Sequence, residues 1–197
     1  MRNTYSIAPE GHIIVDIGTN KHPGKQMLID PPDWELVQAS FGKIGLVENL
    51  NHNGWRVRRY ARGLLLDRDL PFKRRVMNVH TLLLGSGCDH INNDGLDNRR
   101  ANLRSASASE NCCNKDKQLK PCTSCFKGVH YVGNGKRIRR WKAQVKHHGR
   151  VYLVGHFHYE LSAALNYDDY VRVRFGKYAR LNFPRPDEQG IGLEVTK

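Results

Sequence analysis

The sequence predicts an α+β fold, and three stretches of the chain support this prediction. Residues 126–157 contain three β-strand patterns, and residues 160–175 follow with apolar side chains at helix-face intervals. Residues 88–104 combine a carboxylate, an imidazole and several amides with the turn residues Asn and Gly. We therefore expect a small β-rich N-terminal region, a strand–loop–helix segment, and a three-stranded antiparallel sheet packed on one helix.

The first 66 residues carry short strand patterns separated by turn residues. Pro31-Pro32 stop any element that precedes Trp34, and Asp30 or Asp33 can cap a short helix after them. We expect this region to support the segment that follows it. The expected strands are residues 12–17, 43–47 and 55–60.

Residues 88–104 bring together the side chains that hydrolysis of a phosphodiester needs. A hard divalent ion prefers oxygen ligands, which Asp89 and Asn102 can supply. A base beside that ion must take a proton from water, and His90 can do so. An alternative stays open, in which Asp97 caps a helix and Asp89-His90 lies in an ordinary turn.

The same segment resembles the HNH (ββα-metal) nucleases, most closely the homing endonucleases of phages and introns, which carry Asp-His, then Asn, then Asn-Leu-Arg. The resemblance implies a strand that ends in Asp89-His90 and a helix that opens near Asn98. It implies that His90 is the general base and that Asn98 holds the loop that aims it. It also implies that Asp89 and Asn102 are the metal ligands.

Position 102 departs from the family name, because it holds Asn rather than His. An amide oxygen is a harder ligand than imidazole, so we expect Mg²⁺ or Mn²⁺ as the cofactor. A helix is expected from Asp97 to about Asn114. His80 precedes Thr81 where relatives carry His-Arg, and we expect it to be a packed or hydrogen-bonded histidine. Candidates for phosphate contact are Arg99, Arg100 and Arg104.

The C-terminal half has a second resemblance, which rests on Lys127-Gly128-Val129, Trp141-Lys142-Ala143 and Leu181-Asn182-Phe183-Pro184. It resembles the Apetala-type (ethylene-response-factor) DNA-binding domain, a three-stranded sheet packed on one helix that lies in the major groove of double-stranded DNA. Strand alternation puts Trp141, Ala143 and Val145 toward the helix and the residues between them on the open face. The positions that match the family's DNA contacts are His130, Gln144, Lys146, Arg150 and Tyr152.

The charge of the chain agrees with a nucleic-acid partner. Its net charge is +13 and its isoelectric point is about 9.8. Residues 120–186 hold 14 basic against 3 acidic side chains, so they are expected to be the electrostatic anchor. No apolar run is long enough for a membrane span, and we expect a cytoplasmic protein of a bacterium or a phage-infected host.

The five cysteines argue against a disulfide framework and for a reducing compartment. Free thiols are the expectation, and a structural Zn²⁺ that joins the two halves is the alternative. The candidate zinc ligands are Cys112, Cys113, Cys122 and Cys125.

The expected organisation is an N-terminal module (1–66), a nuclease core with its linker (67–120), a DNA-binding domain (121–186) and a tail (187–197). The expected activity is that of a metal-dependent DNA endonuclease. The main alternative is a DNA-binding regulator of the same fold that does not cleave. An RNA-binding module is a further alternative, which the deep and narrow major groove of A-form RNA disfavours. The sequence does not fix the oligomeric state, and a monomer is the working expectation.

Overall fold

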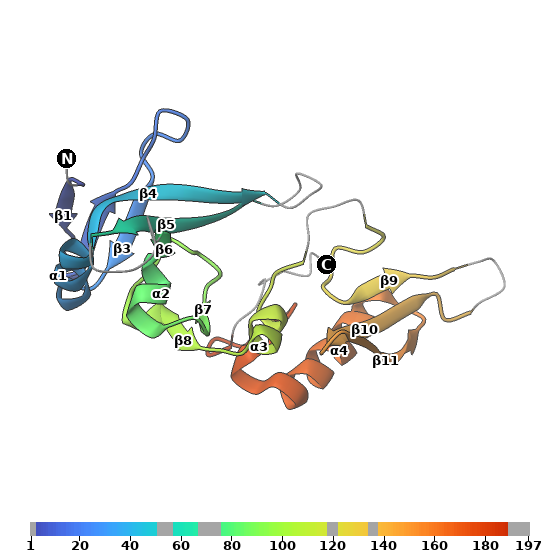
Figure 1. Cartoon of the computed structure of the whole chain (residues 1–197). Coiled ribbons are helices and arrows are strands. Elements are labelled where there is room, and N and C mark those ends of the chain that lie inside the picture. Colours follow the sequence, from blue (N-terminus) through green and yellow to red (C-terminus); the bar gives the residue numbers. More distant parts are fainter. Residues whose placement is uncertain (1–2, 51–56, 67–75, 118–121, 134–137, 189–197) are drawn as a thin grey trace. The chain divides into compact units, whose positions relative to one another are not determined.

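The computed structural model shows an α+β protein, as predicted, and divides the chain into two compact units (Figure 1). The first unit is Met1–Ala106 and the second is Ser107–Lys197. The boundary follows residue 106, so the predicted N-terminal module and the metal loop belong to one unit. The structure describes residues 3–50, 57–66, 76–117, 122–133 and 138–188.

The first unit contains three small antiparallel sheets, of strand order β1-β2-β3, β4-β5-β6 and β7-β8. The strand predictions at 12–17 and 43–47 are confirmed, whereas the first two residues of 55–60 lie outside the described residues. Pro31 and Pro32 form the first turn of α1, where a missing N–H costs nothing. The elements are β1 (Tyr5–Ile7), β2 (Ile13–Asp16), β3 (Gln26–Ile29), α1 (Pro31–Ser40), β4 (Phe41–Leu50), β5 (Val57–Leu65), β6 (Val76–Asn78), α2 (Val79–Leu84), β7 (Cys88–His90), the 3₁₀ turn η1 (Arg100–Asn102) and β8 (Leu103–Ser105).

One hydrophobic core holds this unit together. Alternate residues of β2 and β3 point into it, so Val15 and Met27 are fully buried. Leu96 and Leu103, from the segment with the metal-binding pattern, belong to the same core. The N-terminal strands and the candidate metal loop therefore share one buried apolar surface, and burial of each such side chain contributes about 1.5–3 kcal/mol.

The predicted helix from Asp97 to about Asn114 is wrong. The chain instead makes the short turn η1 and then β8, and α3 (Ala108–Cys113) begins only after Ser107. The reason is a two-stranded ladder, in which β8 pairs with β7 and places Leu103 opposite His90. Ser107 and Glu110 then form a capping box that starts α3.

The second unit is a three-stranded antiparallel sheet of order β11-β10-β9 with one long helix packed on it. All three predicted strands and the predicted helix are confirmed. Val129, Ala143 and Val145 of the sheet meet Ala164 and Tyr167 of the helix in its core. The remaining elements are β9 (Val129–Tyr131), β10 (Trp141–His147), β11 (Arg150–Phe157), α4 (Glu160–Phe175) and the 3₁₀ turn η2 (Gly176–Tyr178).

None of the helices in the described part of the chain has the length and apolar character that a bilayer crossing requires. The predicted linker and tail fall partly on residues 118–121 and 189–197, which lie outside the described residues.

Replacement of Leu96 by Ala should destabilise the first unit by about 2–5 kcal/mol, because it leaves a cavity in the shared core. Leu36→Ala is the matched control, since that side chain is 45% exposed and should change stability little. Chemical denaturation of both variants measures the difference. Equal stability of the two variants would mean that the loop segment is not part of the core.

Candidate active site

A two-stranded ladder positions the two residues that the sequence placed at the reaction centre. β7 ends in Asp89-His90, as predicted, and pairs with β8 so that Asp89 lies opposite Arg104. Both side chains are buried, with 4% of Asp89 and 6% of His90 exposed. The ladder therefore fixes a carboxylate and an imidazole at consecutive positions of one strand, and both are shielded from solvent.

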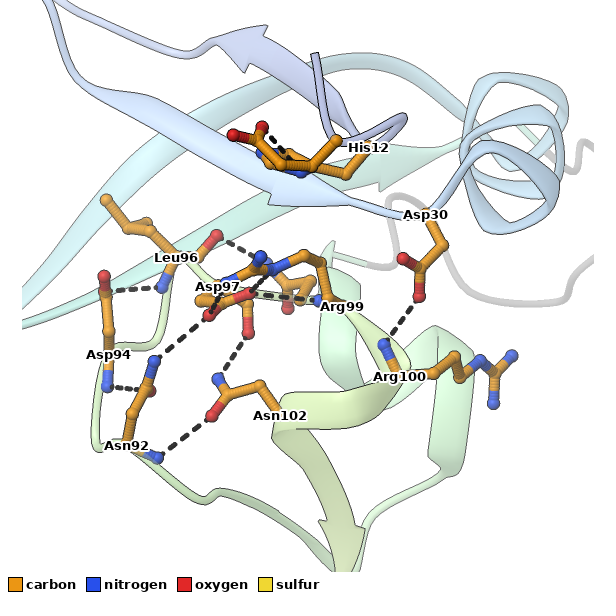
Figure 2. A network of polar contacts seen from close by, with 11 residues as sticks. His12, Asp30, Asn92, Asp94, Leu96, Asp97, Arg99, Arg100 and Asn102 are labelled. Atoms are coloured by element: carbon orange, nitrogen blue, oxygen red, sulfur yellow. Dashed lines mark hydrogen bonds and ion pairs between the residues drawn. The ribbon is translucent and has the colours of Figure 1, made fainter. Parts of the chain in front are cut away.

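The loop after His90 is held by its own polar side chains (Figure 2). Asn92 donates from Nδ2 to Asp97 Oδ2 at 3.1 Å and accepts the backbone N–H of Asp94 at 2.8 Å. Asp94 in turn accepts the backbone N–H of Leu96 at 3.0 Å. Asn93 adopts a positive φ of 64°, which Asn tolerates better than most residues. The Asn-rich sequence thus makes a turn with a defined shape.

Asn102 closes this loop from its far end (Figure 2). Its Nδ2 donates to the backbone oxygen of Asp97 at 2.8 Å, and its Oδ1 accepts the backbone N–H of Asn92 at 3.0 Å. Both ends of the amide are therefore engaged in holding the loop, which is the part that the resemblance gave to Asn98. Metal ligation by Asn102 stays a prediction, and it requires the amide oxygen to serve the ion as well.

Strand β3 holds the loop from outside, a contact that the sequence did not predict. The backbone N–H of Leu28 donates to Leu96 O at 2.9 Å, and the N–H of Asn98 donates to Leu28 O at 2.8 Å. Two residues farther along both segments, the backbone N–H of Arg100 donates to Asp30 Oδ2 at 2.7 Å (Figure 2). The N-terminal module is therefore part of the scaffold of the site.

Asn98 is fully buried and lies beside the candidate base. Its Nδ2 donates to Leu96 O at 3.3 Å, so its Oδ1 is the atom that faces His90 Nε2, 3.4 Å away. An amide oxygen only accepts hydrogen bonds, and this favours the His90 tautomer with its proton on Nε2. The lone pair of the neutral ring then lies on Nδ1, the nitrogen suited to take a proton.

Burial lowers the pKa of His90 below its ordinary value, and this effect exceeds the opposing effects of the hydrogen bond that His90 donates to Asn98 and of the nearby carboxylates. The imidazole is therefore neutral at physiological pH. A neutral imidazole can accept a proton, which is the state that a general base requires.

His80 and Tyr60 pack around the same imidazole. The His80 and His90 rings meet edge to face with their centroids 4.8 Å apart. The centroid of the Tyr60 ring lies 5.3 Å from that of the His80 ring. Burial, His90 and Arg62 together lower the pKa of His80 to about 4. His80 is thus a packed, neutral histidine, one of the two alternatives expected, and its buried Nδ1 has no hydrogen-bond partner among the described residues.

Three predicted phosphate-contact arginines are ion-pair partners of carboxylates. Arg104 is only 9% exposed in its side chain and reaches Asp89 Oδ2 with Nη2 at 2.7 Å and Nε at 3.0 Å. The other two side chains are more exposed and bind acids of the scaffold. Arg99 pairs with Asp97 and Arg100 with Asp33, each at 2.7 Å. Their contact with phosphate stays a prediction.

Of the two predicted metal ligands, Asp89 has the chemistry and the location that a Mg²⁺ ligand needs. Asp89 is a buried carboxylate next to the base, and Mg²⁺ in proteins is commonly held by one or two carboxylates together with water and substrate phosphate. Within the described ranges, no group of three or more His, Cys, Asp and Glu side chains could hold a metal by itself. A weak Mg²⁺ site that water and substrate phosphate complete is compatible with this finding and stays a prediction.

The zinc alternative concerns four cysteines of the second unit and stays a prediction. The four candidates, Cys112, Cys113, Cys122 and Cys125, are all described, and they form no metal-binding group. Burial raises the pKa of Cys113 to about 11, so this thiol keeps its proton at neutral pH.

The strand register divides the predicted DNA contacts of the second unit between two faces. His130 and Gln144 touch through Nε2 and Nε2 at 3.2 Å on the open face, and Lys146 pairs there with Val151. Arg150 and Tyr152 instead lie opposite His147 and Val145, in the rows that face the helix. The five predicted contacts therefore do not form one row, although Arg150 and Tyr152 are exposed at the end of the hairpin. DNA contact by all five residues stays a prediction.

Comparison with family models, with curated proteins and with solved structures finds no match in any of the three.

The stability of the first unit should fall as the pH is lowered from about 6.5 toward 4. In the unfolded chain His80 has an ordinary pKa of 6.5, but in the folded protein its pKa is about 4, so the unfolded state binds the proton first. The loss should be on the order of 3 kcal/mol, and His80→Phe should remove it. Denaturation curves at several pH values measure this. An unchanged pH profile in His80→Phe, with His158→Phe as the exposed control, would contradict the burial of a neutral ring.

Proposed function

We propose that the chain is a metal-dependent DNA endonuclease of the HNH type, a hydrolase of phosphodiester bonds. The observation that carries the proposal is the contact of His90 Nε2 with Asn98 Oδ1 beside the buried carboxylate of Asp89. Burial keeps the imidazole neutral, and this contact favours the tautomer of the neutral ring whose lone pair is on Nδ1. Asp89, His90 and Asn98 all belong to the segment that resembles homing endonucleases.

In the proposed reaction His90 takes a proton from the water that attacks the phosphorus atom. Asn98 holds the ring through Nε2, so the proton is accepted at Nδ1 and the imidazolium that forms stays close to Asp89 and Asp97. A positioned base of this kind typically contributes roughly 10²–10⁴ in rate.

Asp89 would hold the divalent ion, which we propose is Mg²⁺ or Mn²⁺. When bound, such an ion stabilises negative charge on the phosphate and on the departing oxygen. Arg104 supports this arrangement, since its ion pair fixes the carboxylate through Oδ2. The main role of Asn102 is to hold the loop through both ends of its amide. It would be a second metal ligand only if its Oδ1 also bound the ion.

Double-stranded DNA is the proposed substrate because of the charge of the chain. The basic excess in residues 120–186 suits a polyanion, and the sheet of the second unit offers an open face with Gln144 and Lys146. Gln reads adenine through paired hydrogen bonds, and Lys binds phosphate or guanine.

Incubation of the full chain with supercoiled plasmid and Mg²⁺ should give relaxed or linear DNA, and EDTA should prevent it. His90→Ala should reduce cleavage by roughly 10²–10⁴ because the base is lost, while DNA affinity changes little. A gel-shift assay in EDTA measures that affinity in the same preparations. His158→Ala, an exposed histidine of the second unit, is the matched control and should cleave like the wild type.

Cleavage by His90→Ala at the wild-type rate would contradict the role of His90 as the base. Sequence-selective binding without any cleavage in Mg²⁺ or Mn²⁺ would instead support the DNA-binding regulator. Asp89→Asn separates the two further, because it should abolish cleavage in Mg²⁺ or Mn²⁺ and leave binding in EDTA unchanged.

A further inference from the structure

The second unit contains a cavity of about 300 Å³, at the lower end of the range of roughly 300–1,000 Å³ that is typical of small-ligand sites. It lies among the end of α3, the segment before β9, the strand β10 and the end of α4. His130 and Gln144, two of the predicted DNA contacts, line it. The cavity is thus next to the open face of the sheet.

Basic side chains from four separate parts of the chain line this cavity. They are Lys115 after α3, Lys127 before β9, Lys146 on β10 and Arg180 after η2. Asp116 is the one acidic residue among the lining residues, and it pairs with Arg180 at 2.7 Å. The cavity therefore carries an excess of positive charge, which attracts anions.

Lys127 is a half-buried member of this set of cations. Its Nζ donates to the backbone oxygen of Cys113 at 2.6 Å, and burial lowers its pKa to about 8. An ammonium group has three donors, and the Cys113 carbonyl takes one of them. A buried cation is costly unless an anion or further acceptors compensate it, so an anionic ligand in the cavity would gain a strong interaction.

The backbone of Lys127 is fixed by a buried polar network. Asn182 accepts the N–H of Lys127 at 2.6 Å and donates to its carbonyl oxygen at 3.2 Å. Asp168 of α4 in turn accepts from Asn182 at 2.9 and 3.0 Å and from Phe183 N at 2.7 Å. This network gives the Asn of the closing Leu-Asn-Phe-Pro segment a structural role. It also fixes the backbone of Lys127 beside the cavity, and no bound ligand is needed for this.

We propose that this cavity binds a phosphate group, with Lys127 at its base and Lys115 and Lys146 beside it. The phosphate of a DNA backbone and free inorganic phosphate share the chemistry that these ammonium groups recognise. The DNA source depends on the proposed function, because it requires that the second unit bind DNA. Binding of free phosphate does not depend on it.

Thermal unfolding of the full chain tests the proposal without DNA, metal or cleavage. At pH 7, where Lys127 is protonated, inorganic phosphate should raise the Tm of the wild type above that in chloride of equal ionic strength. Lys127→Met should lose this phosphate-specific rise. Lys177→Met, outside the cavity lining, should keep it and also corrects for the general stabilisation that phosphate salts give to proteins.

Lys127 could alternatively serve only to bind the last carbonyls of α3. In that case Lys127→Met would have a lower Tm but the same increment with phosphate as the wild type, and the proposal would be overturned. Lys146→Gln keeps the test valid if Lys127→Met does not fold, because Lys146 is exposed and its replacement should cost little stability. It should reduce the phosphate increment, and an undiminished increment would also overturn the proposal.

Binding of a short duplex in EDTA then distinguishes the two sources of phosphate. If the group belongs to DNA, Lys127→Met should lower the slope of log K against log salt by roughly 0.9, the value for one lost phosphate contact. If the phosphate increment is lost but the slope is unchanged, the cavity binds free phosphate and the DNA source is excluded. Because neither assay measures cleavage, an absence of nuclease activity leaves both results interpretable.

Discussion

The candidate site depends on a pair of backbone hydrogen bonds made by one residue, Leu28. Its N–H donates to the carbonyl of Leu96, and its carbonyl accepts the N–H of Asn98. These two bonds join strand β3 to the loop that carries the polar side chains. The loop has few residues of its own in the core, and Leu96 supplies the apolar contact. Without these two hydrogen bonds, Asn98 would lose the position from which its amide oxygen orients His90.

Electrostatics adds to this mechanical support. Two acidic side chains near the loop form ion pairs with arginines, Asp97 with Arg99 and Asp33 with Arg100. Partly exposed pairs of this kind contribute little to stability, about 0–1 kcal/mol each, so their main effect is to hold the loop in one shape. The buried pair of Asp89 and Arg104 differs, because loss of either partner leaves an uncompensated charge in the interior.

The sequence predicted the elements whose patterns are local. The alternating strands and the helix of the second unit were found from residues 126–175, and the strand that ends in Asp89-His90 followed from the motif. Contacts between distant residues were missed, because neither β3 nor the pairing of Arg100 with Asp33 across 67 positions leaves a local pattern. The start of α3 could have been found, since Ser107 and Glu110 have capping-box spacing.

The candidate site shows the same difference between what local patterns predict and what only tertiary contacts decide. The motif placed His90 next to a carboxylate, but the structure assigns loop-holding contacts to Asn102 and brings Asn98 to the imidazole. The difference arises because both asparagines fit the spacing, and only the tertiary hydrogen bonds separate their roles. The strand register likewise separates Gln144 from Tyr152, because Tyr152 lies opposite Val145, the next residue of β10, whose side chain points to the other face.

Hydrogen exchange of backbone amides tests most directly whether β3 holds the loop. The amide of Asn98 should exchange as slowly as the amides of β2, the central strand of the N-terminal sheet, because both open only with the core of the first unit. Leu96→Ala should speed exchange at both places together. Exchange of the Asn98 amide many times faster than that of β2 in the wild-type chain would contradict the account, since the loop would then open independently of the sheet.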